Sequence, residues 1–434
     1  MSPELAGPIG FAIVVLLIAL RVPIALAMAL VGTVGSIALG GWSSATYVLS
    51  NLPFEAVSTD GMEVVPLFIF MGVFATYSGL SSNLYSGVQA LIGHWRGGIA
   101  MATIGASAGF GAICGSSLAT AATIGRVAMP EMRSRGYADS LAAASVAAGG
   151  TLGVLIPPSI ILILYAILTG ESIGALFAAA LIPGLIGTVL YMAAVQAQVL
   201  RRPELGPAGP RFTFRQKIVA LSRIWDALLL IVLVIGGIYG RFFSPTEAAA
   251  VGAGGALLIT ALRGKLTGKI LVKGLAETAS MTGMIFLILV GAALFNYFIE
   301  LSHLTTVLTD AIQASGLPPL GILFLIIAFY VILGCFMDAL SMVLLTVVPL
   351  YQLATGLGFD GVWFGVLVVT VAEIGLITPP IGMNLFVIQA VTPNLAIGTV
   401  IRGILPFITA DIVRVAILVA FPAVVLYLPR LFGF

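Results

Sequence analysis

GAICGSSLATAATIG, Gly111 to Gly125, and GGTLGVLIPPS, Gly149 to Ser159, are the two segments that decide the fold. The first is an apolar run that turns at a polar tip, Cys114-Gly115-Ser116-Ser117, and returns to a proline at Pro130. The second lies in a long apolar helix and interrupts it with glycines and a pair of prolines. Together they predict a re-entrant helical hairpin followed by a discontinuous helix.

The same order of hairpin and broken helix recurs later in the chain with a different amino-acid sequence. An apolar run turns at Met337-Asp338-Ala339-Leu340-Ser341, returns to Pro349, and is followed by EIGLITPPIG, Glu373 to Gly382. One isolated proline pair is most simply a kink, and the serines near it are then packing residues. Two breaks in matching positions, each preceded by a polar-tipped hairpin, favour a functional site.

The composition places this site inside a membrane protein. The chain has 434 residues, of which 60% are hydrophobic and 8% are charged, whereas about a quarter of a soluble chain is charged. Apolar runs of about twenty residues recur, each long enough to cross about 30 Å of hydrocarbon as a helix. A membrane β-barrel would show alternating polarity instead. We therefore predict an all-α polytopic membrane protein.

The placement of Lys and Arg predicts how the chain is threaded through the membrane. If the first hairpin opens to the cytoplasm, all but three of the 19 basic residues belong to the cytoplasmic side; the exceptions are Arg241, Arg414 and Arg430. The second hairpin then opens to the opposite side, so the two copies form an inverted repeat. Inverted-repeat transporters place their sites near the bilayer midplane, at discontinuous helices.

The chain is divided on this basis. We expect scaffold helices at 1–61, a first transport-domain repeat at 62–200, a cytoplasmic linker at 201–223, scaffold helices at 224–275 and a second transport-domain repeat at 276–434. The hairpins are expected at about 97–129 and 318–350, and the broken helices at about 138–168 and 361–391. The other spans are expected at roughly 5–20, 24–40, 64–92, 172–198, 224–240, 245–262, 276–299 and 400–427.

Broken helices at membrane depth carry backbone groups that lipid cannot satisfy, so they must line a cavity or bind a ligand. Freed carbonyls and the hydroxyls of a hairpin tip are hard oxygen ligands, which suit Na⁺ better than a soft metal. Helix N-termini at the same depth favour an anionic substrate. Because the sequence contains no nucleotide-binding loop and no catalytic set, we expect a non-enzyme driven by an ion gradient or by another chain.

Five charged residues lie in apolar sequence, and three of them have two interpretations each. Asp338 is an intramembrane acid, which indicates a functional site, or it marks a water-exposed end of its hairpin. Glu373 either belongs to an ion site or pairs helices. Arg126 either meets a substrate carboxylate or extends to the membrane surface, and the second is favoured. Asp411 and Arg414 stand three apart and are expected to pair on one helix face.

Three separated motifs carry a resemblance to a known family: GSSLATAATIG (Gly115–Gly125), SPTEAAAVGA (Ser244–Ala253) and GLITPPIGMNLFV (Gly375–Val387). The chain resembles, over essentially its whole length, the large membrane subunit of tripartite ATP-independent periplasmic (TRAP) transporters. The resemblance implies an elevator-type architecture, with two re-entrant hairpins and two discontinuous helices in a moving transport domain. It also implies a multi-pass protein of the bacterial inner membrane.

The resemblance implies partners and cargo. The family takes up organic acids with Na⁺, and it uses a periplasmic substrate-binding protein and a small four-helix membrane subunit. Because the chain starts directly at the first span of the large subunit, a separate small subunit is expected. No organic cofactor is implied.

Family motifs carry over to this sequence residue by residue. The residues implied for the first Na⁺ site are Gly115, Ser116, Ser117, Gly150, Thr151 and Val154. Those implied for the second are Gly334, Asp338, Gly375, Ile377 and Thr378. Those implied for the substrate, between the tips, are Ser116, Thr120, Pro158, Pro380 and Asn384.

Two other functions stay open. One is a stand-alone organic anion symporter of the same architecture, coupled to Na⁺ or H⁺, which needs no binding protein. The other, from a different class, is a non-transporting membrane assembly subunit. The second gives no reason for two polar tips within the membrane, and is therefore disfavoured.

Overall fold

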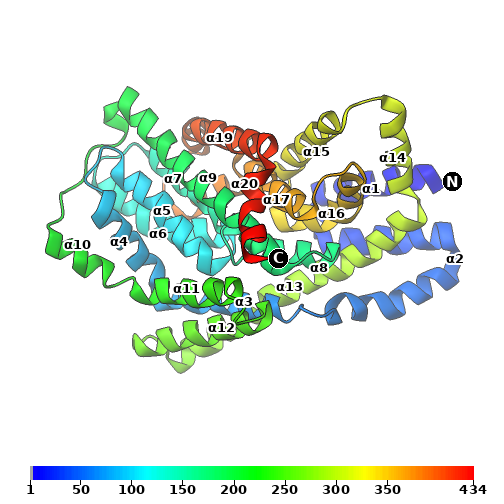
Figure 1. Ribbon diagram of the computed structural model, residues 1–434, viewed down its shortest axis with the longest axis horizontal. Helices are drawn as coiled ribbons and strands as arrows, with labels where there is room; N and C mark the ends of the chain where they lie inside the picture. Colours follow the sequence, from blue (N-terminus) through cyan, green and yellow to red (C-terminus); the bar gives the residue numbers. More distant parts are fainter. Residues whose placement is uncertain (1–2) are drawn as a thin grey trace.

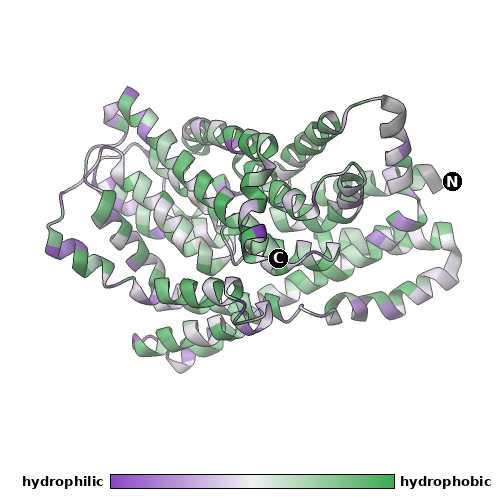
Figure 2. Cartoon of the chain, viewed as in Figure 1, coloured by the Kyte–Doolittle hydropathy of each residue, from purple (hydrophilic) through white to green (hydrophobic). Residues whose placement is uncertain are grey.

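The computed structural model describes the backbone of residues 3–434 and the side chains of residues 5–310 and 316–434. Over these residues the chain is built of α-helices and one short 3-10 turn, with no β-strand. Among the described residues, seven helical spans are long and apolar enough to cross a membrane, one of them the broken helix at 139–169, and Figure 2 shows hydrophobic residues along most of the helices. The predicted all-α polytopic fold is confirmed.

The first hairpin and broken helix occupy residues 98–169. The hairpin arms are α5 (Gly98–Cys114) and α6 (Ser117–Ser134), and the two parts of the broken helix are α7 (Asp139–Leu155) and α8 (Ile160–Thr169). Gly115 makes the turn between the arms with a φ of 65°, in the left-handed region that glycine adopts without a steric penalty. The peptide bond between the two prolines of the break is cis.

The second hairpin and broken helix repeat this order at residues 319–391. The arms are α15 (Pro319–Gly334) and α16 (Ala339–Gly356), and the broken helix consists of α17 (Gly361–Ile377) and α18 (Met383–Val391). Here too the peptide bond between the prolines is cis. The two copies therefore share the sequence of elements that the motifs predicted: arm, tip, arm, long half-helix, proline pair, short half-helix.

The short half-helices exchange partners between the copies. α8, from the first copy, packs on α16 of the second hairpin, and α18, from the second copy, packs on α6 of the first hairpin. Each long half-helix packs on both arms of its own hairpin. This arrangement brings the two hairpins together although about 200 residues separate them in the sequence.

The remaining helices surround this centre, with α2 and α13 side by side at one end of the molecule and α11 and α12 along one edge (Figure 1). Their bounds are α1 (Pro3–Ala19), α2 (Ile24–Ser58), α3 (Val64–Ser78), α4 (Leu80–Ile92), α9 (Ile173–Arg201), η1 (Pro203–Leu205), α10 (Phe214–Leu221), α11 (Trp225–Tyr239), α12 (Pro245–Leu262), α13 (Gly268–Leu301), α14 (Leu304–Ser315), α19 (Ile397–Ala420) and α20 (Pro422–Phe432).

Three elements differ from the expected spans. α2 extends well beyond residue 40, with non-helical geometry at Gly41. The expected span at 64–92 is bent by 67° between α3 and α4, where Gly79 adopts a φ of 78°. The linker contains the helix α10, which Thr213 and Gln216 begin with a reciprocal capping box. The division into scaffold and transport domains stays a prediction.

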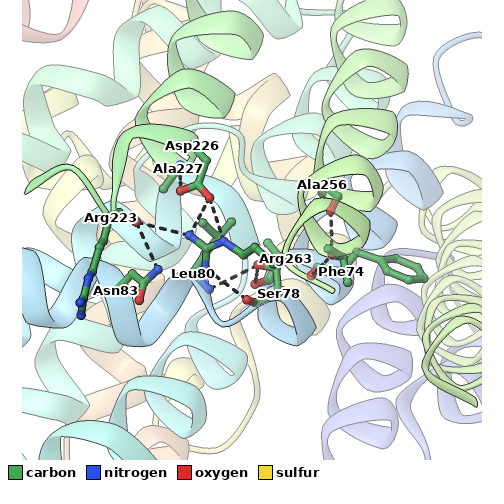
Figure 3. Close-up of polar contacts among 11 residues, drawn as sticks. Phe74, Ser78, Leu80, Asn83, Arg223, Asp226, Ala227, Ala256 and Arg263 are labelled. Carbon is green, nitrogen blue, oxygen red and sulfur yellow. Dashed lines mark hydrogen bonds and ion pairs between the residues drawn. The ribbon is translucent and has the colours of Figure 1, made fainter. Parts of the chain in front are cut away.

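A polar cluster ties α11 and α12 to the bend between α3 and α4 (Figure 3). Arg263, after the end of α12, pairs with Asp226 at the start of α11, with 2.6 Å between Nη2 and the nearest carboxylate oxygen. The other terminal nitrogen of Arg263, Nη1, donates to the carbonyl of Ser78 at 3.2 Å. The pair is largely buried, so it is screened less by water than an exposed ion pair.

We expect Gly375→Ala to destabilise the protein, because a Cβ there would lie 2.5 Å from the Cα of Gly334, and neither backbone can rotate away. Overpacking of this kind costs about 1–3 kcal/mol. The control is Gly254→Ala in α12, where a Cβ meets nothing within 4 Å and alanine favours the helix by about 1 kcal/mol. The measurement is the thermal unfolding midpoint in detergent. A Gly375→Ala midpoint at or above that of the wild type would contradict this packing.

Candidate functional site

The two hairpin tips meet at one cavity of about 540 Å³. From the first tip it is lined by Gly115, Ser116 and Ser117, and from the second by Asp338 and Ser341. α13 and the start of α2 form the opposite wall with apolar side chains. The cavity therefore joins residues from both copies that were singled out as polar tips, and it faces helices that belong to neither hairpin.

Each tip is the N-terminus of the hairpin's second arm. The Ser116 hydroxyl accepts from the backbone N–H of Ala119 at 3.4 Å, and the Asp338 carboxylate accepts from the backbone N–H of Ser341 at 3.0 Å. Both are N-caps, so the free N–H groups and the positive dipole ends of α6 and α16 lie beside the cavity. Asp338 is half-buried in the cavity wall.

The broken helices supply backbone oxygen atoms next to the tips. Val154 in α7 and Leu376 in α17 both line the cavity, and each stands four residues before the second proline of its pair. Since proline has no N–H, neither carbonyl has the usual helical donor four residues further on. Leu376 was not among the predicted residues. The signal was present in the sequence, because its position in the second copy is that of Val154 in the first.

Glycines bring the broken helix of the first copy against its hairpin. A Cβ on Gly150 would lie 3.1 Å from the carbonyl oxygen of Ser117, and one on Gly153 would lie 2.6 Å from Oγ1 of Thr120. Gly375 makes the corresponding backbone approach to Gly334 in the second copy. These four glycines are therefore packing positions, whose lack of a side chain sets the distance between tip and break.

Several predicted residues lie near the cavity but do not line it. The Thr151 hydroxyl donates to the carbonyl of Ala148 at 2.7 Å, and the Thr378 hydroxyl donates to that of Ile374 at 2.6 Å. Asn384 is buried and donates to the carbonyl of Ala147 at 3.2 Å. The others that do not line it are Thr120, Pro158, Gly150, Gly334, Gly375, Ile377 and Pro380.

Two of these buried side chains hold polar atoms without a partner among the described residues. They are Oγ1 of Thr120 and Oδ1 of Asn384. Because buried polar groups are almost always hydrogen-bonded, we expect these atoms to bind a water molecule or a ligand. Thr120 and Asn384 are thus the predicted substrate residues that the structure leaves with unused hydrogen-bonding capacity.

The charged residues outside the tips have definite places. Arg126 is exposed on α6 and does not line the cavity. Asp411 and Arg414 pair on one face of α19 at 2.8 Å, as predicted. Of the two interpretations of Glu373, the structure gives the pairing one: its carboxylate lies 3.4 Å from Nη2 of Arg414, and both side chains are fully buried.

Comparison with known proteins gives a consistent result. The protein-family model described as "Tripartite ATP-independent periplasmic transporter, DctM component" matches residues 11–424. The chain is 35% identical over 381 residues to the C4-dicarboxylate TRAP transporter large permease protein DctM of Pseudomonas aeruginosa, with 88% of each chain covered. It is 33% identical to the sialic acid TRAP transporter large permease protein SiaM of Vibrio cholerae, with 85% of this chain and 86% of the relative covered.

One further relative is a longer protein, and two solved structures share the fold of this chain. The sialic acid TRAP transporter permease protein SiaT of Haemophilus influenzae is 33% identical; the match covers 89% of this chain and 61% of that longer protein. The solved YdaH transporter of Alcanivorax borkumensis superposes with a TM-score of 0.65 at 16% identity, covering 88% of this chain and 90% of the other. MtrF of Neisseria gonorrhoeae gives 0.59 at 16% identity, covering 88% and 84%. At this identity the two structures show the fold alone.

We expect Asp338→Ala to be less stable than Asp338→Asn by about 1 kcal/mol, because Asn replaces Asp as an N-cap and Ala does not. The measurement is the unfolding midpoint of the purified variants in detergent. Asp360, which caps α17 by accepting from the N–H of Trp363 at 2.9 Å, supplies the matched pair Asp360→Ala and Asp360→Asn. Equal midpoints for the two Asp338 variants, with a difference in the Asp360 pair, would show that Asp338 does not cap α16.

Proposed function

This chain belongs to the DctM component family of tripartite ATP-independent periplasmic (TRAP) transporters, and we propose that it imports an organic acid anion together with Na⁺. It is the large permease subunit of such a transporter, a multi-pass protein of the bacterial inner membrane. The observation that carries the proposal is the cavity at which both hairpin tips meet the two proline breaks.

The oxygen atoms around the tips support sodium as the coupling ion. Carbonyls near the breaks and the hydroxyls of Ser116 and Ser117 are hard, uncharged ligands, and Asp338 adds a carboxylate at the second tip. We assign the first ion site to Gly115, Ser116, Ser117, Gly150, Thr151 and Val154. We assign the second to Gly334, Asp338, Gly375, Ile377 and Thr378, and add Leu376 because of its place in the cavity wall.

The N-termini of α6 and α16 support an anionic substrate between the tips, since free N–H groups and the helix dipole both attract negative charge. The names of the relatives mention C4-dicarboxylates and sialic acid, which are carboxylates. We place the substrate near Ser116, Thr120, Pro158, Pro380 and Asn384. The unused polar atoms of Thr120 and Asn384 agree with this place.

Movement in this proposal is of the elevator type. The hairpins and broken helices carry ion and substrate past a scaffold that includes α2, α11 and α12. We also assign α13 to this scaffold, although the division made from the sequence placed residues 276–301 in the second transport-domain repeat. The apolar cavity wall contributed by Ile285 and Ile288 of α13 supports this division, because an apolar wall holds neither ion nor anion and permits sliding. A small four-helix membrane subunit braces the scaffold, and a periplasmic binding protein delivers the substrate.

Asp338→Ala should abolish Na⁺-dependent uptake, because it removes the charged oxygen ligand of the second tip. Cells that produce the chain with its two partner proteins are assayed for uptake of labelled C4-dicarboxylate and sialic acid, with and without a sodium gradient. Asp360→Ala is the control, because it also removes an N-cap but lies outside the cavity. Uptake that Asp338→Ala leaves unchanged, at equal expression, would refute the role of this residue.

The need for partners is tested separately. Liposomes that contain this chain alone, under the same sodium gradient, are expected to accumulate neither carboxylate. Adding the small subunit and the binding protein is expected to restore uptake. Sodium-dependent accumulation by the chain alone would contradict the requirement for partners and would favour a stand-alone symporter.

A further inference from the structure

A second cavity, of about 850 Å³, lies between α11, α12 and the bend that joins α3 to α4. It shares no lining residue with the cavity at the hairpin tips. Its polar part contains Asn83, Arg223, Asp226, Arg263 and Lys265. The other part runs between α11 and α12, and its apolar lining includes Leu229, Leu233, Leu258 and Leu262. We call this cavity the basic groove; its two parts suit a ligand with a polar head and an apolar tail.

The apolar part of the basic groove is open to the surroundings of the molecule. Leu229, Leu258 and Leu262 are 49%, 58% and 75% exposed. α12 is long and apolar enough to cross a membrane, and α11 packs beside it as part of a bent apolar pair with α10. Exposed leucines on such helices face hydrocarbon, and lipid tails are as apolar as leucine. Acyl chains therefore suit this part of the groove.

The polar part has an excess of positive charge. Three cations line it, Arg223, Arg263 and Lys265, and the lining contains one carboxylate. That carboxylate belongs to Asp226, which pairs with Arg263 at 2.6 Å. Among the described residues, no carboxylate forms an ion pair with Arg223 or Lys265. Two positive charges are therefore left to meet an anion.

The backbone around the two unpaired cations is held in place. The carbonyl of Arg223 accepts from Nδ2 of Asn83 at 3.1 Å and from Nη2 of Arg263 at 3.3 Å. Figure 3 shows the Arg223 side chain running away from the pair of Arg263 and Asp226. The N–H of Lys265 donates to the carbonyl of Thr260 at 3.1 Å, in the turn that ends α12. These contacts place both cations at the same end of the groove.

The helix before the groove indicates its depth in the membrane. Phe214, Ile218 and Leu221 lie on one face of α10 and are all exposed, and Arg215 lies beside them. A short helix with an apolar face and basic residues is typical of the boundary between headgroups and acyl chains. Trp225, which lines the groove and is 60% exposed, also suits this boundary. The polar part of the groove is thus placed at headgroup level.

We propose that the basic groove binds an anionic phospholipid. Its phosphate lies between Arg223 and Lys265, and its acyl chains follow Leu229 and Leu258 along α11 and α12. The distribution of Lys and Arg predicts that this end of the groove is cytoplasmic, where basic pockets between membrane helices bind anionic headgroups. The inference depends on neither sodium nor the transported substrate, because its residues lie outside the cavity at the hairpin tips.

Native mass spectrometry of the purified chain tests the choice of lipid. After delipidation in detergent, phosphatidylglycerol and phosphatidylcholine are added at equal concentration. The wild type is expected to retain phosphatidylglycerol in preference, because only this lipid carries a net negative charge. Equal retention of the two lipids would overturn the proposal.

A double variant tests the two cations. Arg223→Gln with Lys265→Gln should bind phosphatidylglycerol about 30-fold more weakly, from the usual contribution of two basic residues at an anionic surface. Arg201→Gln with Lys269→Gln is the control, since it removes the same charge from exposed residues outside the groove. The control should keep wild-type affinity. An unchanged affinity in the groove variant, or an equal loss in the control, would refute the site.

Thermal unfolding separates a lipid from a free anion. Arg223 and Lys265 are exposed, so their double variant should unfold at the wild-type midpoint without lipid. Phosphatidylglycerol should raise the midpoint of the wild type and leave that of the variant unchanged, because a ligand of the folded state stabilises it. Glycerol phosphate, which has the anionic group without acyl chains, should have no effect. A rise with glycerol phosphate equal to that with phosphatidylglycerol would contradict a lipid site.

A protein partner on the same groove is the alternative outcome. The chain purified in complex with its small membrane subunit is expected to retain phosphatidylglycerol as the chain alone does. Loss of the lipid when the subunit binds would assign the basic groove to a protein contact and would overturn the proposal.

Discussion

The need to satisfy every backbone N–H and C=O inside a membrane is the constraint on which this structure depends. Continuous helices meet it within themselves, but a hairpin tip and a proline break do not. Here each unsatisfied element lies beside another: the tips cap their own helices with Ser116 and Asp338, and the breaks lie against the tips. The tip residues Ser116 and Asp338 line one cavity together with Val154 and Leu376, which precede the breaks, and this is why the site lies there.

Exchange between the copies gives the centre its cohesion. α8 packs on the second hairpin and α18 on the first, so neither copy is complete without the other. Glycines set the spacing, because Gly153 and Gly375 admit a hairpin backbone where a side chain would collide. Buried polar contacts that run from Thr151 in α7 to Glu373 in α17 add hydrogen bonds with defined partners to the direct packing of these two helices.

The sequence predicts the local features of this fold better than its long-range contacts. Proline pairs and polar tips are local sequence signals, so both hairpins and both helix breaks can be predicted from the amino-acid sequence. The bend at Gly79 and the break at Gly41 do not, because a glycine in an apolar helix is compatible with a straight span. Tyr191 lies 220 residues from Asp411, and no spacing rule connects them. Leu376 could have been predicted from the sequence, because its position relative to the proline pair matches that of Val154. The pairing of Glu373 could not, because it depends on where the fold places Arg414.

Sodium binding to the folded chain tests the central claim most directly. Thermal unfolding of the purified protein is compared in NaCl, KCl and choline chloride at equal ionic strength. A ligand that binds only the folded state stabilises it by about 2.7 kcal/mol at about 100 times its dissociation constant. The account predicts a rise in midpoint that only sodium produces and that Ser117→Ala or Asp338→Ala removes. Equal midpoints in the three salts would contradict a sodium site at the hairpin tips.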